Sequence, residues 1–237
     1  MRLVSWNLGH QCREDSIPNT FFAAIEALSP DVLSLNEYVH GSTRANMVGR
    51  LKSLGLSHLA VSQRLNSHNQ VLVASRYSLA PGSIVGPATD GHGGASNFLH
   101  VQIPTMNLDF VGVRAPAYSG VALHDYWNKL LQIIRSTKGQ RIAFMGDLNT
   151  DPDQPKRSTA RYLRSLREEG WLIPVPDGLW SFASKAQRYS RIDHAVLSAE
   201  VMVERAQYVR EVESIILAAP GRTDAVSDHT PLVVQLV

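Results

Sequence analysis

The sequence predicts an α+β fold in which two packed β-sheets are flanked by helices. Apolar runs typical of strands alternate only loosely with amphipathic helical patterns, whereas a purely parallel sheet requires stricter alternation. One pair of runs forms a hairpin pattern, and several predicted strands follow one another without a helix between them. We expect a single domain over residues 1–237, because no linker, repeat or low-complexity tract interrupts the chain.

The first third of the chain alternates strand and helix patterns. A helical pattern begins at Asn19 and ends before Ser29-Pro30, because proline disfavours the helical conformation of the residue before it. A second helix is expected between an N-cap at Ser42 and a stop at Gly55. Short apolar runs predict strands at residues 3–6, 32–35, 59–61 and 71–74.

The rest of the chain contains a hairpin, two helices and further strands. Residues 98–103 and 108–113 predict a hairpin that turns at residues 104–107. A last helix is expected to be capped by Ser158 and to end at Gly170. An earlier amphipathic helix follows from apolar residues at positions i, i+3, i+4 and i+7, namely Trp127, Leu130, Leu131 and Ile134. Strands are expected at 141–145, 192–198 and 232–237, and residues 201–216 are expected to be mostly strand.

Composition excludes several classes of protein. No segment approaches the ~20 apolar residues of a membrane span, and the start of the chain lacks the apolar core of a signal peptide. Cys12 is the only cysteine, so an internal disulfide framework and a cysteine-based zinc site are excluded. We therefore expect a cytoplasmic protein. The formal net charge of +2 supplies little support for an anionic partner.

Polar side chains stand at six predicted strand ends, where a rigid element meets an open loop. Each one alone is also compatible with a solvated strand end or a turn cap. Their repetition favours a shared site. Residues two apart on a strand share a face, so Asp147 and Asn149 are expected to aim at one point. The residues are Asn7, Glu37, Arg114, Asp147 with Asn149, Asp193, and Asp228 with His229.

The chemistry of these side chains indicates a hard metal ion and phosphoryl transfer. Carboxylate and amide oxygens without cysteine suit Mg²⁺, with Mn²⁺ as the alternative. Such an ion offsets charge on phosphate oxygens and positions a water molecule. A neighbouring His and Asp add a hydrogen-bond donor to the phosphate, or a route for proton transfer.

The same residues carry a resemblance to a known group of proteins. Their order resembles that of the endonuclease/exonuclease/phosphatase superfamily, which includes exonuclease III, DNase I and the inositol polyphosphate 5-phosphatases. The resemblance covers essentially the whole chain. It implies a DNase I-like four-layer α/β/β/α sandwich of two packed mixed β-sheets, and cleavage of a phosphoester by a metal-activated water. The matching segments are residues 5–7, 35–37, 69–76, 146–149, 191–194 and 227–229.

The resemblance also implies roles for individual residues. Glu37 would be the principal metal ligand, with Asn7 and Asp228 close by. Asp147 would orient or deprotonate the attacking water, and Asn149 would hold phosphate or metal.

In the same way, His229 would donate to the scissile phosphate, and Asp193 would orient His229. This last pairing has a physical basis, because a carboxylate selects the imidazole tautomer and stabilises the imidazolium.

Arg114 departs from the superfamily pattern, since many members have His or Tyr at this position. Arginine cannot act as a general acid at neutral pH, but it can bind phosphate and stabilise transition-state charge. Its other interpretation is a surface Arg paired with a nearby carboxylate. Because arginine cannot protonate the leaving group, that proton would come from Tyr118, His229 or metal-bound water. Tyr118 is also expected to contact the substrate.

A second departure follows Glu37. Abasic-site endonucleases of this superfamily usually carry Glu-x-Lys, whereas this chain has Val39 at the Lys position, followed by His40. The difference counts against specialised abasic-site repair.

The leading hypothesis is a Mg²⁺-dependent phosphodiesterase, an endonuclease or exonuclease with DNA as the expected nucleic-acid substrate. Arginines around the last predicted helix form the best basic patch, namely Arg157, Arg161, Arg164 and Arg167. A phosphatase or phosphodiesterase acting on a small molecule or a lipid headgroup is the alternative enzyme. A non-catalytic binding module on the same fold is the alternative outside enzymes. We expect no membrane partner, and the sequence indicates no protein partner.

Overall fold

A computed structural model describes residues 1–9, 17–39, 44–65, 69–88, 95–154, 156–184, 186–220 and 225–237. Cys12, His40 and the predicted N-cap Ser42 lie outside the described residues.

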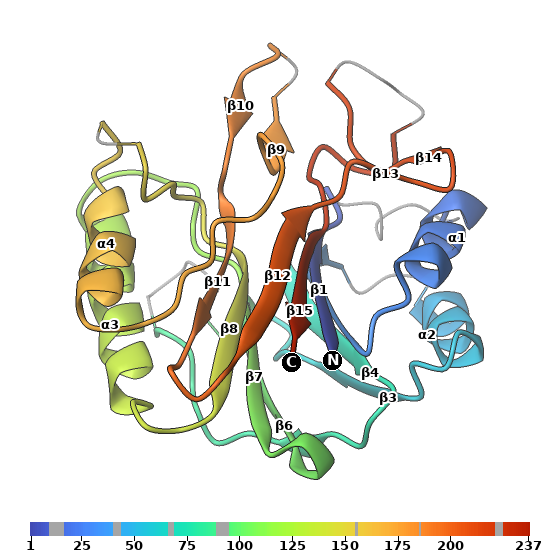
Figure 1. Cartoon of the computed structure of the whole chain (residues 1–237), viewed down its shortest axis with the longest axis horizontal. Coiled ribbons are helices and arrows are strands. Elements are labelled where there is room, and N and C mark those ends of the chain that lie inside the picture. Colours follow the sequence, from blue (N-terminus) through green and yellow to red (C-terminus); the bar gives the residue numbers. More distant parts are fainter. Residues whose placement is uncertain are drawn as a thin grey trace.

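Two mixed β-sheets form the centre of the fold (Figure 1). The six-stranded sheet contains, in spatial order, β12 (Val203–Tyr208), β15 (Leu232–Leu236), β1 (Arg2–Asn7), β2 (Val32–Tyr38), β4 (Gln70–Ser75) and β3 (His58–Val61). The five-stranded sheet contains β11 (Asp193–Leu197), β8 (Ile142–Asp147), β7 (Leu108–Val113), β6 (Phe98–Ile103) and β5 (Ala80–Pro81). β1 and β2 are parallel, as are β7 and β8, and the remaining pairs in both sheets are antiparallel.

Two small antiparallel ribbons lie beyond these sheets. β9 (Phe182–Ala183) pairs with β10 (Tyr189–Ser190), and β13 (Glu211–Val212) pairs with β14 (Ile215–Ile216). Both ribbons stand at the end of the molecule where β1 and β8 end and β11 begins (Figure 1). The predicted hairpin is also present, and its turn is a short 3₁₀ helix at Pro104–Met106 between β6 and β7.

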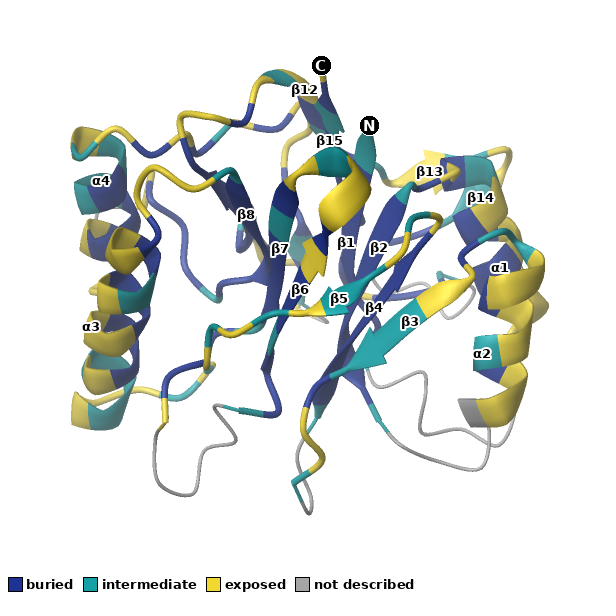
Figure 2. Cartoon of the chain, turned by 90° about the horizontal axis from the view of Figure 1, so that it is seen from below, coloured by how far each residue is buried: buried dark blue, intermediate teal, exposed yellow. Residues whose placement is uncertain are grey.

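Helices cover the outer face of each sheet (Figures 1 and 2). α1 (Asn19–Leu28) and α2 (Arg44–Ser53) lie on the six-stranded sheet, and α3 (Val121–Ser136) and α4 (Ala160–Glu168) lie on the five-stranded sheet. The predicted four-layer α/β/β/α sandwich is therefore confirmed. In the described part of the chain, no helix is long and apolar enough to cross a membrane.

One predicted helix boundary is wrong. α4 begins at Ala160, so Thr159 rather than Ser158 stands at the N-cap position. The Thr159 hydroxyl makes no capping bond and instead donates to the Thr150 hydroxyl at 2.6 Å. This side chain therefore serves a contact between loop and helix that sequence spacing does not reveal.

Strand alternation divides the core into layers. On β1, Leu3 packs between the two sheets, while Val4 and Trp6 pack toward α1. On β8, Met145 packs between the sheets, while Phe144 packs toward α3 and α4. Each strand therefore has one face in the space between the sheets and one face under helices.

At one end, the inner faces of these strands become polar. Asp147 continues the inner face of Met145 on β8, and Asn7 continues that of Leu3 on β1. Asp193 begins the inner face of β11. All three polar residues are almost fully buried. The candidate site is thus the polar end of the core between the sheets.

Candidate active site

A bulge in β2 directs two consecutive residues toward this polar end. The register of β2 against β4 shifts by one residue between Leu35 and Tyr38, and Glu37 within the bulge has φ of +57°. Asn36 consequently contacts Asp147 of β8, and Glu37 contacts Arg114, the residue that follows β7. The prediction that Glu37 lies just past the strand is wrong, because β2 continues through Tyr38. The bulge, rather than the strand end, redirects its carboxylate.

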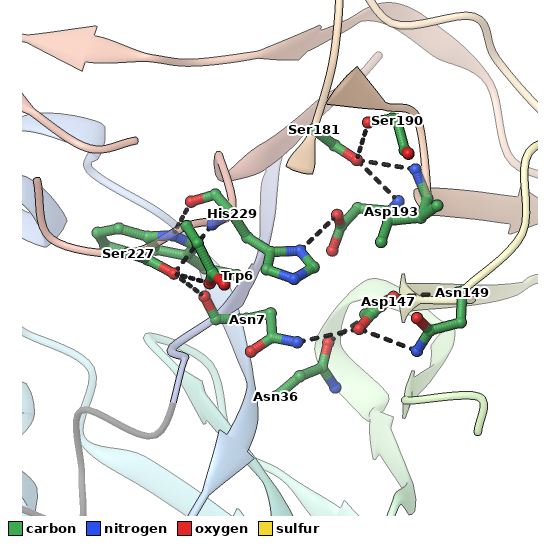
Figure 3. Close-up of polar contacts among 12 residues, drawn as sticks. Trp6, Asn7, Asn36, Asp147, Asn149, Ser181, Ser190, Asp193, Ser227 and His229 are labelled. Carbon is green, nitrogen blue, oxygen red and sulfur yellow. Dashed lines mark hydrogen bonds and ion pairs between the residues drawn. The ribbon is translucent and has the colours of Figure 1, made fainter. Parts of the chain in front are cut away.

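Asp147 lies at the centre of the site and is 1% exposed. Its Oδ2 accepts hydrogen bonds from Asn7 Nδ2 at 3.0 Å and from Asn149 Nδ2 at 3.2 Å (Figure 3). Asp193 stands directly opposite it on β11. Burial and the Asp193 charge raise the pKa of Asp147 to about 6, against the lowering influence of nearby positive charges. This carboxylate can therefore take up a proton near neutral pH.

Asn149 lies beside Asp147 for a reason other than the predicted one. β8 ends at Asp147, so strand alternation does not extend to Asn149. Asn149 instead has φ of +48°, a left-handed conformation that asparagine tolerates better than most residues. Its backbone N–H donates to Asp147 Oδ1 at 3.0 Å, and its Nδ2 donates to the Ala115 carbonyl at 2.8 Å. Asn149 therefore holds Asp147 against the segment that follows β7.

His229 and Asp193 form a buried pair (Figure 3). The His229 Nδ1–H donates to Asp193 Oδ2 at 2.9 Å. Burial by itself would lower the pKa of His229, but the charges of Asp193, Asp147 and Asp228 outweigh this effect and raise it to about 9. The imidazole is therefore protonated at neutral pH. The ring also packs against Phe182 of β9, with ring centroids 4.8 Å apart.

Arg114 bridges the two sheets at the site. Its Nη2 lies 2.8 Å from Glu37 Oε1, and its Nε lies 3.8 Å from Asp147 Oδ2. The sequence allowed two interpretations of Arg114, a phosphate contact or a pair with a carboxylate, and the structure shows the pair within the site itself.

Tyr118, predicted to contact substrate, is half-buried near Tyr126. Burial, and next the Tyr118 phenol, raise the pKa of Tyr126, while Arg114 lowers it.

Asp228 lies on the solvent-exposed rim of the site. The Ser227 hydroxyl donates to the Asn7 carbonyl at 2.7 Å and attaches this turn to the end of β1. Gly9 has φ of +53°, and a Cβ there would lie 2.9 Å from Asp228 Oδ1. Glycine therefore permits both the turn after Asn7 and the close approach of Asp228.

Asn36 is a structural contributor that sequence reasoning did not single out. Its Oδ1 accepts the backbone N–H of Asp147 at 3.2 Å, and its Nδ2 donates to the Val113 carbonyl at 3.3 Å. A Cβ on Gly146 would collide with that same Val113 carbonyl oxygen, so the strands approach closely here. The available signal was an amide side chain directly before Glu37 in a largely apolar strand.

Ser181 and His194 also position the site without having been predicted. The Ser181 hydroxyl oxygen accepts the backbone N–H of Ile192 at 2.9 Å and that of Asp193 at 3.1 Å. His194 is fully surrounded by protein, and its Nε2 lies 2.9 Å from the Thr150 carbonyl. Burial lowers the pKa of His194, so it is a neutral link between the segments after β8 and before β11.

The arginines around α4 bind within the protein. Arg157 donates to the Asn149 carbonyl at 3.1 Å, and Arg164 donates to the Pro152 carbonyl at 2.9 Å. Arg167 pairs with an exposed carboxylate of the same loop at 3.0 Å. These contacts stabilise the loop after Asn149 and give no independent support for a nucleic-acid surface.

The site residues fit a divalent cation in their chemistry. The Arg114 guanidinium is a stand-in cation between the Glu37 and Asp147 carboxylates, so this position already attracts positive charge. Carboxylate and amide oxygens, including that of Asn7, are hard ligands that suit Mg²⁺ or Mn²⁺. Within the described ranges, no three His, Cys, Asp or Glu side chains are grouped as a metal site. A cation at Glu37 Oε1 would therefore compete with the Arg114 guanidinium.

Comparison with known proteins identifies the group to which this arrangement belongs. The profile of the Endonuclease/Exonuclease/phosphatase family matches residues 4–229. The chain belongs to this family. The endonuclease/exonuclease/phosphatase family consists of hydrolytic phosphoesterases, including nucleases and phosphatases, and its members generally use divalent metals. A search among curated proteins found no significant match.

Solved structures share the fold at low sequence identity. An endonuclease/exonuclease/phosphatase from Beutenbergia cavernae has a TM-score of 0.72 and 19% identity, covering 99% of this chain and 70% of that chain. An AP endonuclease from Archaeoglobus fulgidus has a TM-score of 0.73 and 15% identity, covering 100% and 99%. The 3′ phosphatase NExo from Neisseria, bound to product DNA hairpin, has a TM-score of 0.71 and 15% identity, covering 100% and 99%. At these identities the likeness establishes the fold.

Proposed function

We propose that this protein hydrolyses phosphodiester bonds with the help of a divalent cation, Mg²⁺ or Mn²⁺, and that its substrate is DNA. One observation carries the proposal. A carboxylate that can accept a proton near neutral pH, Asp147, shares a site with a protonated imidazole, His229. General acid–base catalysis uses one group that is deprotonated and acts as the base, and a second group that is protonated and acts as the acid. Different environments keep the two groups in these states.

The proposed roles follow from these states. Asp147 takes the proton of the attacking water, and Asn149 holds Asp147 in place for this transfer. His229, oriented by Asp193, donates its Nε2–H to a phosphoryl oxygen. Arg114 binds the phosphate through its planar guanidinium, which matches oxyanion geometry.

Glu37, Asn7 and Asp228 are proposed to hold the cation, and Tyr118 is proposed to contact the substrate at the rim. A bound cation offsets negative charge on the phosphate oxygens and lowers the pKa of a bound water. The proposal of DNA as substrate is supported by the family, which includes nucleases, and not by the arginines around α4.

A cleavage panel with the purified protein tests the proposal. The substrates are plasmid DNA, single-stranded DNA, RNA, abasic duplex, a chromogenic phosphodiester and a phosphomonoester, each with Mg²⁺, Mn²⁺ or chelator. We expect cleavage of a DNA substrate with either metal and none with chelator. Asp147→Asn serves as the inactive control.

Three outcomes would contradict parts of this proposal. Cleavage that persists in chelator removes the cation from the mechanism. Cleavage restricted to small phosphoesters replaces the nuclease with a small-molecule phosphoesterase. A wild-type protein that cleaves nothing in the panel, yet retains DNA in a binding assay, is a binding module on this fold.

A further inference from the structure

We propose that Arg114 couples cation binding to phosphate binding by exchanging the Glu37 carboxylate for a phosphate oxygen. This inference rests on the proposed function. In the free protein, the guanidinium neutralises Glu37, which is the residue proposed to hold the cation. In the loaded protein, the same guanidinium would bind the phosphate, and Glu37 Oε1 would become available to the cation.

The ion pair occupies an atom that the cation would need. Arg114 Nη2 lies 2.8 Å from Glu37 Oε1, within the range of a charge-assisted hydrogen bond. The Glu37 side chain is only 9% exposed, so water solvates its carboxylate poorly. Loss of the Arg114 contact therefore costs free energy unless another cation replaces it. A cation that binds Glu37 must therefore displace this guanidinium or approach it against like-charge repulsion.

The other edge of the guanidinium is poised for a second anion. Arg114 Nε is buried and has no hydrogen-bond partner among the described residues, and Asp147 Oδ2 is 3.8 Å away. A buried donor without a partner carries a desolvation cost, and a phosphate oxygen would relieve it. The Arg114 side chain is 19% exposed, so the arginine is accessible to a ligand from solvent.

The backbone of β2 makes Glu37 the stationary partner of this exchange. Glu37 sits in the bulge with φ of +57°, and its neighbour Asn36 is bonded to the backbone of both β7 and β8. Arg114 stands one residue beyond β7 and has a long side chain with more freedom. The exchange is therefore a movement of the Arg114 side chain between two anions.

Thermodynamic linkage gives this exchange a measurable consequence. A phosphate that draws Arg114 away from Glu37 raises the affinity of the site for the cation, and the cation must raise the affinity for phosphate by the same factor. Removal of the guanidinium abolishes the coupling, because Arg114 then no longer competes with the cation for Glu37 Oε1. Cation affinity should then be high whether or not phosphate is present.

The test measures Mn²⁺ binding directly, through the electron paramagnetic resonance signal of free Mn²⁺. Wild type, Arg114→Ala and Arg114→Gln are titrated with and without dimethyl phosphate, and circular dichroism confirms that each variant is folded. Without dimethyl phosphate, we expect both variants to bind Mn²⁺ about 10-fold more tightly than wild type, within the usual range of coupling between sites. Dimethyl phosphate should tighten Mn²⁺ binding by wild type and leave both variants unchanged.

Arg135→Ala is the matched control, because it removes one positive charge from an exposed pair with Glu169, remote from the site. It should bind Mn²⁺ as wild type does. Equal Mn²⁺ affinity in wild type and both Arg114 variants, unchanged by dimethyl phosphate, overturns the coupling and leaves the proposed phosphodiesterase intact. Absence of Mn²⁺ binding in all four proteins, with or without dimethyl phosphate, overturns the cation in the proposed function and the coupling with it.

Discussion

Replacement of Asp193 by Asn tests the central pair of the site. Asp193 is fully buried, and it accepts the Nδ1–H of His229 at 2.9 Å. Its charge is the main influence that raises the pKa of His229 to about 9, above the ordinary value of 6.5. An asparagine keeps the shape and removes the charge. In Asp193→Asn, the pKa of His229 should therefore fall toward its ordinary value, because burial lowers it and only the weaker influences of Asp147 and Asp228 still raise it.

The expected size of the effect follows from this change. At pH 8, an imidazole with a pKa of about 9 is roughly 90% protonated, and one with a pKa of 6.5 is roughly 3% protonated. If protonated His229 donates to the phosphate, kcat/KM at pH 8 should fall about 30-fold from the loss of protonation alone. The fall should become smaller toward pH 6.5, where the variant regains its proton.

The free energy of unfolding should also depend on pH through the protonation of His229. Because the folded pKa of His229 lies above the unfolded value, its protonation stabilises the fold fully below about pH 6.5, and this stabilisation is lost as the pH rises through 9. In chelator, Asp193→Asn should be less stable than wild type at pH 7, and the difference should shrink by about 2 kcal/mol at pH 9.5. Urea unfolding at the two pH values measures this difference.

Titration of the His229 ring by nuclear magnetic resonance provides the decisive measurement. Asp177→Asn is the matched control, since that carboxylate is exposed and pairs with Arg205 at the surface. It should leave the midpoint of His229 near pH 9. If Asp193→Asn shows the same His229 midpoint and the same pH dependence of kcat/KM as wild type, the assignment of Asp193 as the group that charges His229 is wrong.

Three further substitutions test other parts of the site. Asp147→Asn should reduce turnover by roughly 10²–10⁴, the scale of a positioned base, while Asp153→Asn, a change at an exposed carboxylate, should leave it unchanged; a steady-state assay that finds both variants fully active removes Asp147 from the mechanism. Glu37→Gln should raise the Mg²⁺ concentration needed for half-maximal activity, and an unchanged metal titration would exclude Glu37 as a ligand. Gly146→Ala should lower the free energy of unfolding by about 1–3 kcal/mol, because its Cβ collides with the carbonyl that ends β7. In the same urea experiment, Gly49→Ala, which has open space around it, should be neutral or stabilising, and equal behaviour of the two variants would contradict the close approach of β7 and β8.

The sequence by itself predicted the helices, the longer strands and the polar residues of the candidate site. Periodicity located the helices and the longer strands, because a buried strand or a helix face repeats its apolar residues at fixed spacing. Polar residues at the ends of apolar strands then stood out against that background. Asp147, Asp193 and His229, which the sequence predicted as site residues, converge in the structure.

Predictions from residue patterns were wrong where the backbone departs from regular strand geometry. The sequence placed Glu37 beyond a strand, whereas a bulge within β2 turns it toward the site. It also attributed the approach of Asn149 to strand alternation, whereas a left-handed residue after the end of β8 produces it. Both conformations persist because surrounding contacts stabilise them. Neither produces a residue pattern that can be recognised in a single sequence.

Only the tertiary structure decided which polar groups meet. Asn36 reaches Asp147 across 111 positions of the chain, and Asn7 reaches it across 140. The Arg114–Glu37 pair likewise joins the two sheets. These contacts depend on how the two sheets pack face to face. The residue types and their order along the chain do not show which side chains meet across the sheets. The sequence therefore specified a set of polar residues, and the packing of the two sheets decided that Arg114 pairs with Glu37 and that Asp193 pairs with His229.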